Sequence, residues 1–206
     1  EFILANQSSS SPDKQDLEIY WTEEMAAVLE TWGEGNAWAE IEYLMAARKG
    51  KVLDIACGTG KTMQILSRYP DLTIFGVDIS NLLISQALAR GIPQERLMIA
   101  DATSLQFADD HFDFGYSIGS LEHFTSEGID ACIRECHRVV KQASFHHVPV
   151  SRSQCDEGWI TPNQSYFNNS EQWWINKFAA IYPQVHALGS RWDDQISVGK
   201  WFICSK

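Results

Sequence analysis

The chain has 206 residues, 45% of them hydrophobic, and a formal net charge of −11. This length and apolar content suit one domain with one substantial core. Because phosphate contacts supply much of the affinity for nucleic acids, the acidic balance argues against a nucleic-acid partner. No apolar run approaches the ~20 residues that span a membrane, and the five cysteines form no regular framework. We therefore expect a cytoplasmic protein with reduced thiols and no membrane partner.

We expect a single domain, residues 1–206, in three parts: a tail with cap helices (1–49), a core (50–141) and a C-terminal segment (142–206). In the first part Ser11-Pro12 suits a helix start, Gly33 and Gly35 interrupt the helical run, and Asn36 can cap a second helix. The side chains that then follow at helical spacing are Trp38, Ile41, Leu44, Met45 and Arg48. This pattern predicts an apolar stripe that faces inward.

Residues 52–62 join a predicted buried strand to a predicted helix through a turn that contains Gly58 and Gly60. Glycines let a ligand approach the backbone, and the following helix presents unpaired N–H groups, so the turn predicts a nucleotide-like cofactor. A phosphate-binding P-loop is excluded, because Ile55 stands where it needs glycine. A dinucleotide-binding turn is disfavoured, because Met63 stands where helix packing needs a small residue.

Three further segments follow the turn in order. Residues 73–80 form a β-branched and aromatic run that ends in Asp78, 18 residues after Gly60, where an acid can accept hydrogen bonds from ribose hydroxyls. Residues 97–102 form a third apolar run that contains Asp101. The strand predicted over residues 112–120 then leads into Leu121-Glu122-His123-Phe124.

Together, Asp54-x-Ala56-x-Gly58-x-Gly60, Asp78, Asp101 and Phe112-Asp113 resemble, in order, four motifs of the class I S-adenosylmethionine-dependent methyltransferases. The resemblance covers roughly residues 50 to 141, and Ala56 replaces the glycine that the family usually has. It implies an α/β fold with a doubly wound, mostly parallel seven-stranded sheet in the order 3-2-1-4-5-7-6, the last strand antiparallel. N-terminal cap helices are expected beside that sheet.

The resemblance also implies S-adenosyl-L-methionine as the cofactor, with S-adenosyl-L-homocysteine as the product. Asp78 would bind the ribose and Asp101 the adenine amino group. The cofactor-binding residues that we expect are Asp54, Ala56, Cys57, Gly58, Gly60, Asp78, Ile79, Asp101, Ala102, Ser117 and Ile118.

The C-terminal segment is predicted to complete the sheet. Residues 144–150 suit a fifth strand, 171–182 a helix, and 184–190 with 196–205 a closing antiparallel pair. Relatives usually carry a longer turn before the fifth strand, whereas Gln142-Ala143 lead into it almost directly. A two-residue junction and a few missing residues are both open, and the mass of the intact protein distinguishes them.

All eight tryptophans lie outside residues 39–158, in the segments that cover the cofactor and build the acceptor pocket in the family that the chain resembles. We expect some of Trp21, Trp32, Trp159 and Trp173 to line an aromatic pocket for an apolar, planar or cationic acceptor. The alternative is that they pack cap helices onto the sheet.

Methyl transfer needs a base only when the acceptor carries a proton. Glu122 and His123 follow the fourth strand, and His146 and His147 lie on the fifth. Adjacent strand residues face opposite sides, so only one of the two strand histidines can face the acceptor, and we place His146 there. Glu122 and His123 are the candidate catalytic residues.

No metal is expected. Gly119 stands where metal-binding relatives have a second acid before Glu122, and Cys132, Cys136 and His137 lack a second ligand pair nearby. We predict a methyltransferase that acts on a small molecule, with O- or N-methylation open and the oligomeric state unknown. The alternatives are a methyltransferase-like regulator that binds the cofactor without chemistry, and a dinucleotide-dependent oxidoreductase.

Overall fold

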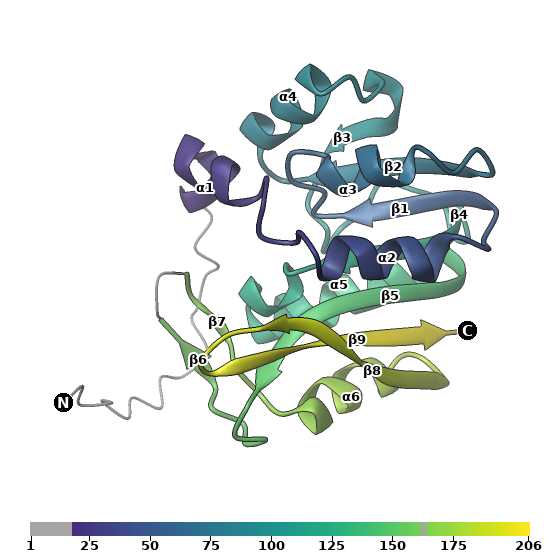
Figure 1. Cartoon of the computed structure of the whole chain (residues 1–206). Coiled ribbons are helices and arrows are strands. Elements are labelled where there is room, and N and C mark those ends of the chain that lie inside the picture. Colours follow the sequence, from purple (N-terminus) through teal and green to yellow (C-terminus); the bar gives the residue numbers. More distant parts are fainter. Residues whose placement is uncertain (1–17, 162–163) are drawn as a thin grey trace.

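The computed structural model describes residues 18–161 and 164–206. Within them, seven strands form one central sheet in the order β3-β2-β1-β4-β5-β9-β8, with helices on both faces (Figure 1). The strands are β1 (Gly50–Ile55), β2 (Leu72–Asp78), β3 (Leu97–Ile99), β4 (Phe112–Ile118), β5 (Val140–Ser151), β8 (Gln184–Asp193) and β9 (Ser197–Ser205). Strands β1 to β5 pair in parallel, whereas β9 runs antiparallel to both β5 and β8. The strands β6 (Trp159–Ile160) and β7 (Tyr166–Phe167) form a separate hairpin, so β8 and β9 are the sixth and seventh strands of the central sheet. The predicted order 3-2-1-4-5-7-6 and the reversed last strand are therefore confirmed.

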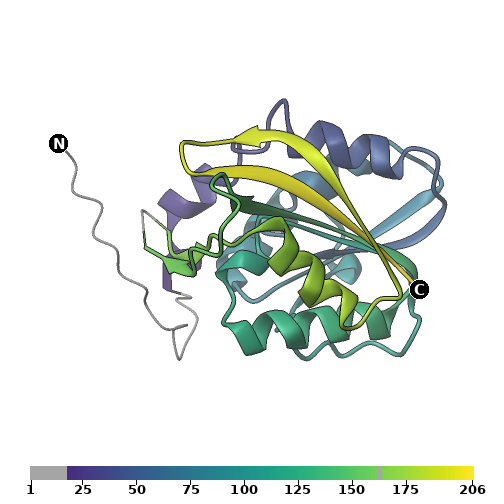
Figure 2. The same ribbon diagram turned by 90° about the horizontal axis from the view of Figure 1, so that it is seen from below.

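The sheet separates two apolar cores. Helices α2 (Ala37–Met45), α3 (Lys61–Leu66) and α4 (Asn81–Ala89) contribute buried residues to one of them. The other lies under α5 (Ser126–Val139) and α6 (Glu171–Ala179), and Figure 2 shows these two helices on the side of the sheet opposite to α2. The last four residues of β1 are all buried, as expected for an inner parallel strand that is covered on both faces.

The N-terminal segment differs in part from the predicted helix. The start at Ser11-Pro12 lies outside the described residues, and within them a 3-10 helix, η1 (Glu18–Trp21), precedes a short α1 (Glu23–Val28). Helix α1 begins anew because the Thr22 side chain accepts a hydrogen bond from the Met25 N–H. The second helix begins where predicted, with Asn36 as its N-cap.

Two boundaries in the C-terminal segment also differ from the prediction. The fifth strand begins at Val140 rather than residue 144, so α5 passes into β5 without a loop. Helix α6 ends at Ala179, three residues before the predicted end, and the N–H of Ala180 bonds back to the Asn176 carbonyl. The nearby Pro183 restricts the residue before it to extended conformations, which opposes a longer helix.

The carboxyl ends of the parallel strands lie at one edge of the sheet, which carries α1 and the β6–β7 hairpin (Figure 1). A short 3-10 helix, η2 (Gln94–Arg96), precedes β3, and another, η3 (Leu121–His123), follows β4. In the described part of the chain, no helix is long and apolar enough to cross a membrane.

Candidate functional site

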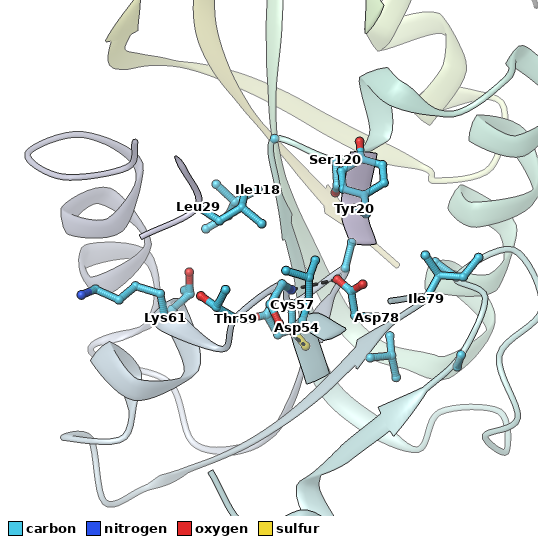
Figure 3. Close-up of a pocket in the computed structure, with 18 of the residues that line it drawn as sticks. Tyr20, Leu29, Asp54, Cys57, Thr59, Lys61, Asp78, Ile79, Ile118 and Ser120 are labelled. Atoms are coloured by element: carbon cyan, nitrogen blue, oxygen red, sulfur yellow. Dashed lines mark hydrogen bonds between the residues drawn. The ribbon is translucent and has the colours of Figure 1, made fainter. Parts of the chain in front are cut away.

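The turn after β1 is fixed to the end of β2. Gly58 has a left-handed backbone, with φ of 55°, and its N–H donates to Asp78 Oδ2 at 2.8 Å. Figure 3 marks a hydrogen bond at Asp78 with a dashed line. The other carboxylate oxygen of Asp78 accepts from the Ser80 N–H at 2.9 Å. A glycine adopts this backbone without the strain that a side chain would add. Asp78 therefore ties the glycine turn to the start of α4.

A cavity of about 110 Å³ lies over this turn (Figure 3). The predicted cofactor residues that line it are Asp54, Ala56, Cys57, Gly58, Asp78, Ile79, Asp101, Ala102 and Ile118. Further lining residues that were not among the predicted cofactor-binding residues include Tyr20, Leu29, Trp38, Lys61 and Phe124. The sequence motifs thus bring together much of the cavity wall, and the N-terminal segment with Tyr20, Leu29 and Trp38 adds to it.

Gly60 and Ser117 lie outside this lining. Gly60 is the N-cap of α3, and a β-carbon there would stand 3.0 Å from the Ala87 Cβ, so it allows α3 and α4 to approach. The Ser117 side chain is buried, and its Oγ lies 2.8 Å from His146 Nδ1.

Two buried carboxyl groups mark the floor of this cavity. Burial raises the pKa of Asp54 well above its ordinary value, although the Tyr116 hydroxyl donates to it at 2.8 Å. Burial also raises the pKa of Asp78, against the opposing effect of hydrogen bonds from the Ser80, Gly58 and Ile79 backbone. Positive charge or hydroxyl donors on a ligand stabilise the ionised forms of such groups. The cationic sulfonium and ribose hydroxyls of S-adenosylmethionine fit this requirement.

The N-terminal segment covers the cavity and is held on α4. The Ser80 hydroxyl donates to the Tyr20 carbonyl at 2.7 Å, and Trp21 Nε1 donates to Asn81 Oδ1 at 2.8 Å. A further ion pair joins Glu30 to Arg90, and Arg90 Nε also donates to the Thr59 carbonyl in the glycine turn. The cover is thus bonded to the same elements that form the cavity.

A second cavity of about 360 Å³ adjoins the first. It shares Tyr20, Leu29, Trp32 and Gly119 with the first cavity. Its other lining residues are Met25, Val28, Glu122, His123, His147, Pro149, Gln164, Tyr166, Trp192, Asp194 and Ile196. Ordinary small-molecule sites occupy about 300–1,000 Å³ and have mainly apolar walls, which this cavity matches.

The two candidate catalytic residues, Glu122 and His123, both line the second cavity. Burial raises the pKa of Glu122 to about 8, and burial lowers the pKa of His123 to about 4, against a hydrogen bond to the Ser165 carbonyl. Both groups are therefore uncharged at neutral pH, so the 3.7 Å contact between Glu122 Oε1 and His123 Nε2 is not an ion pair. His123 Nδ1 donates to the Ser165 carbonyl at 2.7 Å.

Of the predicted acceptor-contacting residues, Trp32 alone lines either of these two cavities. Trp21 is 40% exposed. Trp159 packs edge-on against Phe167, and Trp173 stacks on the same Phe167 ring. Trp159 and Trp173 thus pack at the β6–β7 hairpin, and none of these three side chains lines either cavity.

The strand histidines alternate as expected, but in the other sense. His146 is fully buried and stacks on Phe178 of α6, whereas His147 lines the second cavity. The alternation of side chains along β5 would have pointed to His147 if the sequence had shown which face of the strand meets the cavity.

The cysteines of α5 lie in the core. Cys132 and Cys136 are fully buried, with their Sγ atoms 3.9 Å apart. Among the residues that the structure describes, no group of three His, Cys, Asp or Glu side chains is arranged to hold a metal ion.

Comparison with known proteins finds similar domains. The sheet order and the glycine turn are those of a Rossmann-like α/β domain. Residues 52–143 match the model of the methyltransferase domain family. Residues 52–143, less than half of the chain, therefore resemble a methyltransferase domain, and the chain shares its fold with SAM-dependent methyltransferases of known structure.

Three similar proteins illustrate the range of this family. The O-methyltransferase rstn1 of Aspergillus nomiae is 36% identical over 87 residues, which are 40% of this chain and 39% of that protein. The probable tRNA methyltransferase 9B of Mus musculus is 34% identical over 110 residues, 52% of this chain and 23% of that protein. A SAM-dependent methyltransferase from Methanosarcina mazei has the same fold, with a TM-score of 0.58, 18% identity and coverage of 80% of this chain and 95% of that one. The chain thus matches less than half the length of the two curated relatives.

Proposed function

We propose that this protein transfers a methyl group from S-adenosylmethionine to a small, uncharged acceptor of mainly apolar character. The observation that carries this proposal is that two cavities meet at Tyr20, Leu29, Trp32 and Gly119. Transfer requires the two reactants to be close and aligned, and adjoining cavities supply that arrangement. The bound cofactor supplies a methyl group on a cationic sulfur. Asp78 would hold the ribose and Asp101 the adenine.

The walls of the second cavity support an uncharged acceptor. Of the described residues that line it, none is Lys or Arg, and its aromatic members are Tyr20, Trp32, Tyr166 and Trp192. Anionic groups such as phosphates are usually bound by Arg or Lys, so a nucleic acid finds no cation in this lining. The net charge of −11 also repels the phosphates of a nucleic acid over longer distances. Because a tRNA methyltransferase is among the similar proteins, tRNA is the second candidate acceptor.

The test has a binding step and a transfer step. Calorimetric titration should show binding of S-adenosylhomocysteine and none of NAD, which would contradict the oxidoreductase alternative. Labelled methyl transfer should then be compared across phenols, alcohols, amines, carboxylic acids and total tRNA, with and without EDTA. We expect label on an uncharged small molecule and no effect of EDTA. Label on tRNA alone would overturn the acceptor class, and binding without any transfer would support the regulator.

A further inference from the structure

A chain of hydrogen bonds runs from α2 through β8 to β5, beside the second cavity. The Ser190 hydroxyl donates to Glu40 Oε2 at 2.7 Å, and His147 Nε2 lies 3.0 Å from Ser190 Oγ. Gly199 leaves room for this contact, because a β-carbon there would stand 2.7 Å from His147 Nε2. The three side chains come from residues 40, 147 and 190, and only the fold brings them together.

Glu40 is ionised at neutral pH. Burial by itself would raise the pKa of its carboxyl group, but hydrogen bonds from Trp201, Arg191 and Ser190 together lower it below the ordinary value. Trp201 Nε1 donates to Oε2 at 2.8 Å, and the Arg191 backbone N–H donates to Oε1 at 2.7 Å. An ionised carboxylate has no proton to donate.

This fixes the proton on the imidazole of His147. Ser190 has one proton, which it gives to Glu40, and its oxygen accepts from the Trp192 N–H at 3.1 Å. The contact with His147 must therefore be a donation from Nε2–H to Ser190 Oγ. Burial lowers the pKa of His147 to about 4, against the opposing charge of Glu40, so the ring is neutral and has no second proton. Nδ1 then carries a free lone pair, no hydrogen-bond partner for it exists in the described structure, and the atom is shielded from solvent by the side chains packed around it.

The ring of His147 lies close to the junction of the two cavities. It lines the second cavity, and its centroid lies 6.2 Å from that of Trp32, which lines both. The Gly119 N–H, also at the junction, donates to the His147 carbonyl at 2.9 Å. A buried base without a partner thus stands on the acceptor side, next to the place where the cofactor side begins.

We propose that, once the covering segment that carries Trp32 moves aside, His147 accepts the hydroxyl proton of the acceptor through Nδ1, and that Glu40 and Ser190 are positioning residues that keep this nitrogen unprotonated. The acceptor is then a neutral molecule that carries a hydroxyl group on a planar apolar body, as a phenol does. This inference rests on the proposed function, because it assigns the acceptor end of the same site.

The proposed step balances. The acceptor oxygen forms a bond to the methyl carbon, the electron pair of the broken carbon–sulfur bond stays on sulfur, and the hydroxyl proton moves to His147 Nδ1. A methylated oxygen that still holds its proton is a much stronger acid than imidazolium, so even a weakly basic imidazole takes that proton. Glu40 stabilises the resulting imidazolium through Ser190, in the way that a buried carboxylate supports histidine in hydrolase triads.

The first experiment uses phenol and anisole as probes, since they have similar shapes but anisole has no hydroxyl proton. In the complex with S-adenosylhomocysteine, nitrogen-15 NMR of labelled histidine should show His147 neutral with its proton on Nε2. Phenol should shift the Nδ1 resonance and anisole should not. His147→Phe should weaken phenol binding about five- to tenfold and leave anisole binding unchanged, as expected for one hydrogen bond. His186→Phe on exposed β8 is the matched control. A proton on Nδ1, or equal responses to both probes, would overturn the inference.

The second experiment separates the roles in catalysis. With a hydroxyl acceptor, His147→Phe should lower kcat about a hundredfold or more, the range for loss of a general base, while the affinity for S-adenosylhomocysteine stays unchanged. Ser190→Ala should lower kcat less and should populate the other tautomer in the NMR spectrum. His147→Asn, which retains an acceptor near Nδ1, should keep the preference for phenol over anisole but not the transfer rate. Wild-type rates in His147→Phe would overturn this inference alone, whereas failure of the unaltered protein to bind S-adenosylhomocysteine would overturn the proposed function.

Discussion

The cofactor side and the acceptor side of the site are built in different ways. On the cofactor side, most lining residues outside the N-terminal cover lie at the carboxyl ends of parallel strands, at residues 54–59, 77–79, 100–102 and 118–120. On the acceptor side, the lining residues come from the N-terminal cover, η3, β5, the β6–β7 hairpin and the β8–β9 turn. One side is therefore a set of local turns at a common edge, whereas the other is assembled from segments far apart in the chain.

This difference corresponds to what each side must recognise. Parallel strands place their carboxyl ends at one edge, so short motifs after successive strands suffice for a cofactor that is shared by a whole class. The match to the methyltransferase family ends at residue 143, before His147, Tyr166 and Trp192 of the acceptor side. Loops on a fixed scaffold are free to vary, and acceptor specificity is expected in that variable part.

The largest expected effect is on the cofactor side. Gly58→Val should lower the affinity for S-adenosylhomocysteine by about a hundredfold or more, because a β-branched residue is strained at a left-handed φ and adds a side chain to the cavity wall. Gly189→Val on β8 is the control, since nothing lies within 4 Å of a β-carbon there and the backbone is not left-handed. Calorimetry compares the two variants, and tight binding by Gly58→Val would place the ligand elsewhere.

The second prediction uses the buried histidine of β5 that faces away from both cavities, His146. Burial lowers the pKa of His146 to about 3, so the folded protein resists its protonation whereas the unfolded chain takes up a proton near pH 6.5. The stability that this group contributes is complete above about pH 6.5 and is lost as the pH falls toward about 3. Between pH 6.5 and 4.5, the unfolding free energy should fall about 2 kcal/mol further in the unaltered protein than in His146→Phe.

Denaturant titrations of both proteins across this pH range measure the difference. A pH-independent difference between them would mean that His146 is protonated in the folded state, and that the core under α6 admits charge.

The third prediction compares two acids on the cofactor side. Asp78→Ala should weaken S-adenosylhomocysteine binding about tenfold to a hundredfold, since it removes charge-assisted hydrogen bonds worth ~1.5–3 kcal/mol. Asp101→Ala should have a smaller effect, because Asp101 is exposed and its Oδ1 already accepts from the Thr103 N–H and hydroxyl. Equal effects, or none for a folded Asp78→Ala protein, would contradict the ribose assignment.

The smallest expected effect concerns the cover that both sides share. The first cavity, about 110 Å³, is smaller than the ~300–1,000 Å³ of ordinary ligand sites, so the covering segment should move as the cofactor enters. Hydrogen exchange in residues 18–36 should slow on binding of S-adenosylhomocysteine, and tryptophan fluorescence should change. Trp32→Phe should reduce that change, whereas Trp21→Phe should not, because Trp32 lines the cavity, as Trp38 does, and Trp21 does not. Unchanged exchange would show the cover to be permanent structure.

The sequence by itself determined the cofactor side, because its signals lie within single strand–turn–helix units. The glycine turn and the acid that ends β2 are patterns of neighbouring residues, and alternating strands and helices with the family resemblance imply the sheet order that the structure has. Local patterns also located the cap at Asn36.

Only the tertiary structure decided the acceptor side. Alternation along β5 requires His146 and His147 to face opposite ways, but which of them meets the cavity depends on what covers each face. Helix α6 places Phe178 against His146, while α2 and β8 bring Glu40 and Ser190 to the other face of the strand. Those contacts join residues more than 30 positions apart, and no local pattern in the chain encodes such a distance.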